Sequence, residues 1–216
     1  MEHQEPSDVQ NLIDRLEENS QESLAELFTY YQDRLRRMVS YRLDRRLQGR
    51  VSPSDVIQDA YLDARDRIPH FIEKRASMSF FVWLRLLVKQ RLITLQRQHL
   101  GAKMRDVRQE VAFDYGAGSN ATSISIAAHM ATSLTSPSQA LAHAELVSKL
   151  QEALQQMGPL DCEILALRHL EELSNDETSE VLGLKKAAAS NRYVRALKRF
   201  RDVLSEIPGY DSGERK

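Results

Sequence analysis

The sequence of 216 residues has a single cysteine, Cys162, and it is also poor in glycine (eight) and proline (six). One cysteine excludes an internal disulfide, a CxxC redox motif and a four-cysteine zinc site. The most apolar run, residues 80–88, is interrupted by Arg85, whereas a membrane-spanning helix needs about 20 apolar residues. The first ten residues are acidic and polar, unlike a secretory signal. We therefore expect no membrane segment and a reducing, cytoplasmic compartment.

Motifs of enzyme chemistry are also missing. The sequence contains no GxxxxGK[ST], GxSxG or HExxH pattern, and its six histidines do not have metal-ligand spacing. A catalytic site needs a recognisable acid, base or nucleophile constellation, and none can be named here. We therefore expect no enzymatic activity, no metal and no cofactor.

Hydrophobic residues repeat at three- and four-residue steps nearly throughout, which predicts an all-α protein. Residues 116–136 differ, because they carry no charged side chain and are rich in Ser, Thr, Ala and Gly. The sequence therefore predicts two small helical domains joined by a flexible linker. The predicted parts are residues 1–108, the linker 109–137, the second domain 138–208 and a disordered tail 209–216.

Several helix ends can be predicted from capping residues. Ser52 followed by Pro53 predicts the start of a helix that reaches about residue 68, where Pro69 would end it. Ser174 with Glu177 three residues later is a capping box, and Gly183 is placed to end the helix that follows. The last helix is predicted to begin near Lys185.

The net charge of −1 conceals a strong segregation of charge along the chain. Residues 34–50 and 85–108 are rich in arginine and lysine, and residues 161–180 are acidic. The final helix, residues 185–201, carries seven basic residues and no acid. A short capped helix, a glycine turn and a basic helix are the pattern of a helix-turn-helix, whose second helix enters the DNA major groove.

The helix from residue 53 carries an acidic stripe, since at about 100° per residue its four aspartates fall within an arc of roughly 80°. These are Asp55, Asp59, Asp63 and Asp66. Like charges at this spacing destabilise an isolated helix. On charge alone, a basic partner surface and a solvated face are both open interpretations.

The segment from Ser54 to Tyr61 resembles the acid-x-x-Gln-acid motif of the extracytoplasmic-function class of bacterial sigma factors. The resemblance covers about residues 8–108 and 138–206, and it implies domains similar to sigma regions 2 and 4. In that family this helix binds the coiled coil of the largest subunit of core RNA polymerase. The resemblance therefore implies polymerase binding by Asp55, Gln58 and Asp59, with Asp63 of the same stripe.

Residues 80–84, 91–93 and 97–99 are similar to the promoter-melting segment and minus-ten recognition helix of that family. The implied DNA-binding residues are Arg85, Lys89, Arg91, Arg97 and Gln98. By resemblance, the loop from Pro69 to Met78 would hold a flipped base. Trp83 lies in an apolar run, and we expect it to pack in the core rather than stack on a base.

The second domain resembles the minus-thirty-five reader of the same family, on residues 165–170, 182–184, 191–193 and 195–197. The expected DNA-binding residues at the start of the last helix are Lys185, Lys186, Ser190, Asn191, Arg192 and Arg195. Lysines at 185–186 and alanines at 187–189 depart from the family pattern, so individual base contacts do not follow from it.

The sequence thus favours a sigma factor that binds core RNA polymerase and places its two domains on the minus-ten and minus-thirty-five elements of promoter DNA. The alternative is a helix-turn-helix regulator that acts without polymerase. A third hypothesis is an adaptor that binds proteins alone. The sequence leaves open whether an anti-sigma factor is a further partner.

Overall fold

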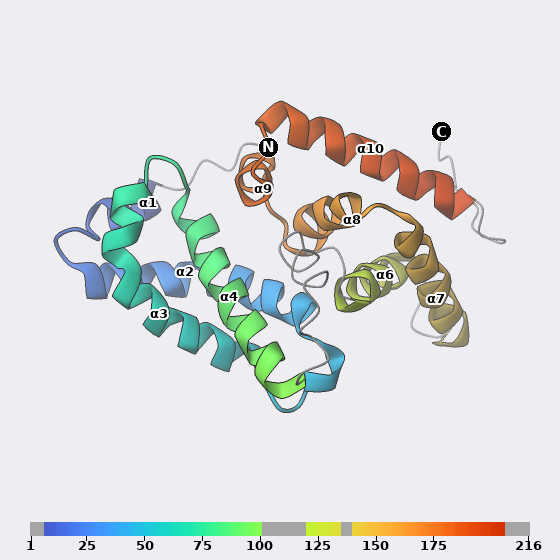
Figure 1. Cartoon of the computed structure of the whole chain (residues 1–216), viewed down its shortest axis with the longest axis horizontal. Helices are drawn as coiled ribbons and strands as arrows, with labels where there is room; N and C mark the ends of the chain where they lie inside the picture. Colours follow the sequence, from blue (N-terminus) through green and yellow to red (C-terminus); the bar gives the residue numbers. More distant parts are fainter. Residues whose placement is uncertain (1–6, 101–119, 135–139, 206–216) are drawn as a thin grey trace. The chain divides into compact units, whose positions relative to one another are not determined.

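The computed structural model describes residues 7–100, 120–134 and 140–205. Within these ranges the regular structure is helical and no strand forms, apart from an isolated bridge between Gln48 and Val51. The expected all-α fold class is therefore confirmed. No helix in the same ranges is long and apolar enough to cross a membrane. The chain divides into two compact units, Met1–Met104 and Arg105–Lys216, which we describe separately (Figure 1).

Unit 1 is built on three long helices that pack on one another, with a short helix against the first of them (Figure 1). Its elements are α1 (Ser7–Asp14), α2 (Ser20–Arg42), the 3-10 turn η1 (Arg45–Leu47), α3 (Pro53–Lys74) and α4 (Phe80–Leu100). Aromatic rings close the core at the turn between α3 and α4. Phe71 lies 4.9 Å from Trp83 and 5.1 Å from Phe80, measured between ring centroids. Trp83 is buried, as expected.

The start of α3 forms as predicted. The Ser52 hydroxyl accepts a hydrogen bond from the Asp55 backbone N–H (3.1 Å), and the Asp55 carboxylate accepts one from the Ser52 N–H (3.4 Å). These bonds satisfy two of the backbone groups that a helix end leaves unpaired. Pro53 follows at the first helical position.

The predicted end of this helix is wrong, because Pro69 lies inside α3, which continues to Lys74. Proline removes one backbone hydrogen bond. However, Ile68 and Phe71 on either side of it are buried, and their packing holds the helix together. The expected loop from Pro69 to Met78 is therefore reduced to the turn after Lys74.

Unit 2 contains α6 (Asn120–Leu134), α7 (Ala140–Gln156), α8 (Pro159–Leu165), the π-helical turn η3 (Ala166–Leu170), α9 (Asn175–Leu182) and α10 (Lys186–Ser205). Helix α6 falls in the stretch expected to be a flexible linker. It packs on α7, and its Ile126, Ala127 and Ala131 are buried. For residues 120–134 the linker expectation is therefore corrected, while the rest of the linker lies outside the described residues.

The helix-turn-helix of unit 2 is formed by α9 and α10. The Ser174–Glu177 capping box is present at the start of α9, as predicted. Gly183 ends α9 in the left-handed conformation, with φ 61° and ψ 30°. An L-residue with a side chain pays a steric cost in this conformation, which explains the glycine. Helix α10 begins three residues later and packs on α8 and α9.

Candidate partner and nucleic-acid surfaces

The acidic face of α3 is accessible in unit 1. Asp55 and Gln58 are exposed, and Asp59 and Asp63 are half-buried. Exposed Leu62 lies among them, and 47% of its surface is accessible. The stripe is not uniformly free, however, because the Asp55 carboxylate takes part in the capping box and Asp59 is paired with Arg91.

The ion pair between Asp59 and Arg91 joins α3 to α4. Both the Nε and an Nη of Arg91 donate to the same carboxylate oxygen, at 3.0 and 2.8 Å. The side chains of Arg91 and Asp59 are 33% and 38% exposed. A residue expected at the polymerase surface and a residue expected at the DNA surface therefore contact each other.

The structure corrects the expected position of Arg85, whose exposed fraction is 0%. Its guanidinium lies inside unit 1 and does not reach a surface, because α4 is buried nearly all round in its first half. Farther along α4, Arg97 and Gln98 are exposed, while Lys89 is half-buried. The accessible side of the second half of α4 also includes Gln90 and Thr94, which sequence reasoning did not include.

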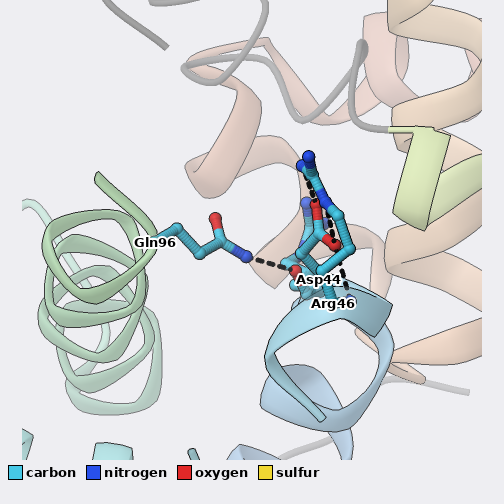
Figure 2. Close-up of polar contacts among 4 residues, drawn as sticks. Asp44, Arg46 and Gln96 are labelled. Carbon is cyan, nitrogen blue, oxygen red and sulfur yellow. Dashed lines mark hydrogen bonds and ion pairs between the residues drawn. The ribbon is translucent and has the colours of Figure 1, made fainter. Parts of the chain in front are cut away.

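Gln96 fixes this second half of α4 against the end of α2. Figure 2 shows its amide pointing at the end of α2, where it donates a 3.0 Å hydrogen bond to the backbone carbonyl of Arg42. In the same view Asp44 binds Arg46 through both carboxylate oxygens, at 3.0 and 2.7 Å (Figure 2). The hydrogen bonds from Arg46 lower the pKa of Asp44. The single acid of the arginine-rich segment thus neutralises one of its arginines.

A buried carboxylate of α8 binds two arginines of α10. Asp161, whose side chain is 2% exposed, accepts from the Nε of Arg192 at 2.7 Å and from an Nη of Arg199 at 2.6 Å. Arg192 was expected to contact DNA, but its side chain here joins two helices of unit 2. An acid of the acidic segment 161–180 thus neutralises part of the positive charge of the basic segment 185–201.

The start of α10 presents polar and basic groups to solvent. Lys185, Lys186, Ser190, Asn191 and Arg195 are exposed. The ammonium group of Lys186 binds Asp176 of α9 at 2.7 Å. The Asn175 side chain donates to the Lys186 carbonyl at 3.1 Å. These contacts fix the first turn of α10, where a recognition helix meets base edges.

Val194 of α10 is apolar, yet it does not share the buried side of the helix with Phe200. Its exposed fraction is 62%, and it lies between the exposed Asn191 and Lys198, one turn away on either side. Its angular position could have revealed this, because it falls about 120° from Phe200 at 100° per residue. An apolar side chain here has the chemistry to contact a thymine methyl group.

Burial shifts the pKa values of Cys162 and His169 toward the neutral form of each side chain. Burial raises the pKa of the Cys162 thiol to about 11, and the neighbouring carboxylates Asp161 and Glu163 add to the shift. Desolvation lowers the pKa of His169, whose ring is 3.1 Å from the Tyr193 hydroxyl. Among the described residues no group of three or more His, Cys, Asp or Glu side chains could hold a metal ion.

Residues 148–200 match the model of a protein family described as Sigma-70, region 4. The matched residues run from within α7 through α8, η3 and α9 into α10, and so include all of α9 and most of α10. The match covers about a quarter of the chain and shows that this part of unit 2 is similar to Sigma-70 region 4. No curated protein gave a significant match to the chain.

Proposed function

We propose that this chain is a sigma factor of the extracytoplasmic-function class that binds core RNA polymerase and directs it to promoters. The observation that carries the proposal is the helix-turn-helix of α9 and α10, whose α9, turn and first fifteen residues of α10 match Sigma-70 region 4. Its second helix presents cationic and polar side chains to solvent at its amino-terminal end. Such groups give affinity through phosphates and specificity through base edges.

In this proposal unit 2 reads the minus-thirty-five element with Lys185, Lys186, Ser190, Asn191 and Arg195. Arg192 is left out of the base-reading set because the buried Asp161 binds it, whereas Lys186 is kept because its pair with Asp176 is exposed. Unit 1 contacts the minus-ten region with the accessible side of α4, where Arg97 and Gln98 lie with Lys89 at its edge. The face of α3 with Asp55, Gln58, Asp59 and Asp63 binds the coiled coil of the largest polymerase subunit.

The decisive experiment is reconstitution. The purified full chain is added to core RNA polymerase on genomic DNA, and the 5′ ends of the transcripts are sequenced. We expect defined start sites that share two upstream elements. Specific duplex binding without any association with core polymerase would instead support the polymerase-independent regulator.

A charge-introducing variant tests the α3 surface without breaking a contact. Gln58 is exposed and makes no hydrogen bond or ion pair in the described structure, so Gln58→Arg leaves both the cap and the Asp59 pair intact. A basic partner should repel the new charge, and association with core polymerase should weaken at least tenfold. The matched control is Gln32→Arg, the same change at an exposed position of α2. Equal affinity of the two variants would contradict the assignment of α3.

A further inference from the structure

The proposed function assigns Asp59 to a protein partner and Arg91 to DNA, yet the two side chains bind each other. We propose that this ion pair withholds Arg91 from DNA in the free chain, and that a cationic partner docking on Asp59 releases it. Polymerase binding and DNA binding by unit 1 are thereby coupled. The inference rests on the proposed function and deepens it by naming the contact that links the two surfaces.

The geometry makes the two engagements compete. Both nitrogens of Arg91 converge on a single oxygen of Asp59, at 3.0 and 2.8 Å, so the guanidinium is directed along the α3–α4 seam. Arg67 is held at the same seam, where it donates to the Gln90 side chain at 3.2 Å. A phosphate bound to Arg91 would have to replace the carboxylate of Asp59, because the bonded guanidinium edge cannot serve both anions.

Exposure makes the exchange feasible. With 38% of the Asp59 side chain accessible, a lysine or arginine of the partner can approach the carboxylate from solvent. Partly exposed pairs contribute little to stability, so a better-placed cation can displace Arg91 without unfolding the helices. A fully buried pair could not exchange partners in this way, since breaking it leaves an uncompensated charge in the core. The pair thus has the accessibility that a reversible contact requires.

Arg91 is also close to the surface it would join. It follows the exposed Gln90 directly and lies two turns before Arg97 and Gln98 on α4. Once freed, its guanidinium would add one positive charge to the accessible side of this helix. Each phosphate that a protein neutralises steepens the slope of log affinity against log salt concentration, by about 0.9 for a duplex and about 0.7 for a single strand.

The test measures the affinity of the full chain, without polymerase, for a fluorescent single-stranded oligonucleotide over a range of salt concentrations. Asp59→Asn should tighten binding about two- to fivefold at low salt, because it removes the competing charge of a partly exposed pair. The slope of log affinity against log salt should steepen by about 0.7. The matched control is Asp33→Asn, which removes one exposed carboxylate of unit 1 that makes no hydrogen bond or ion pair in the described structure.

A double variant identifies Arg91 as the group released. In an Arg91→Gln background, Asp59→Asn should bring no more gain than Asp33→Asn does. The inference is overturned if the two single asparagine variants bind alike, or if the gain of Asp59→Asn persists without Arg91. The proposed function fails on different results: no polymerase-dependent initiation in the reconstitution, or an unchanged affinity of Gln58→Arg for core polymerase. The two failures are therefore distinguishable.

Discussion

The carboxylate of Asp161 offers the sharpest test of how unit 2 is held together. It is buried and binds two arginines of α10, at 2.7 and 2.6 Å. Asp161→Asn keeps the size of the side chain but removes its charge. Asparagine has one acceptor oxygen in place of two, so one of the two arginine hydrogen bonds is lost and the other is made to an uncharged acceptor, while the hydrophobic packing around α8 is unchanged.

The expected cost follows from the burial of the three groups. Removing one partner of a fully buried pair costs about 3–5 kcal/mol. Here the side chain of Asp161 is 2% exposed, but those of Arg192 and Arg199 are 38% and 63% exposed and can regain water. We therefore expect a loss of about 2 kcal/mol in the free energy of unfolding of unit 2. At roughly 5 °C per kcal/mol, its thermal midpoint should fall by about 10 °C.

Thermal and urea unfolding followed by circular dichroism would measure this loss. Asp202→Asn, at an exposed position of α10, is the control and should stay within about 0.5 kcal/mol of wild type. Double-mutant cycles should give a larger coupling of Asp161 to Arg192 than to Arg199, because Arg192 is less exposed. If both couplings were below about 0.3 kcal/mol, the carboxylate would not hold α10 in place.

Three further outcomes can be measured. The Cys162 thiol has its pKa raised from 9.0 to about 11, so it should resist aromatic disulfide reagents at pH 8 until the chain is denatured. The folded state favours the protonated thiol, so the contribution of Cys162 to the free energy of unfolding should disappear as the pH rises from about 9 to 11. Gly183→Ala should cost about 1 kcal/mol from backbone strain alone, since no atom lies within 4 Å of the added Cβ, and Gly183→Asn should cost less, as seen by chemical denaturation. Replacing thymine by uracil in the bound element should weaken binding up to about fourfold if Val194 contacts the methyl group, and Val194→Ala should remove that difference.

Local signals in the sequence were sufficient for much of the fold. The caps at Ser52 and Ser174 and the end at Gly183 depend on residues within three positions of one another, and each is confirmed. The apolar run with Trp83 was also placed correctly in the core. These features could be predicted because the interactions that determine them are made within one helix turn or one hydrophobic stripe.

Contacts between distant segments could not be predicted in the same way. Asp161 is 31 residues from Arg192, and Asp59 is 32 residues from Arg91, so neither pair leaves a pattern along the chain. The helicity of residues 120–134 was missed because their alanines gain stability by packing on α7 rather than from an amphipathic stripe. Pro69 was predicted to end the helix because proline disfavours a helix locally. The burial of its neighbours Ile68 and Phe71, which keeps the helix intact, is a tertiary effect that the sequence pattern did not show.

The continuation of α3 through Pro69 also sets a length. With 22 residues, α3 is about 33 Å long, and the rings of Phe71, Phe80 and Trp83 clamp its end onto the start of α4. The two helices therefore form a rigid helical hairpin and are not joined by a long flexible loop. The distance between the acidic face of α3 and the far end of α4 is therefore fixed. A partner bound to α3 consequently also sets the position of the carboxyl-terminal half of α4.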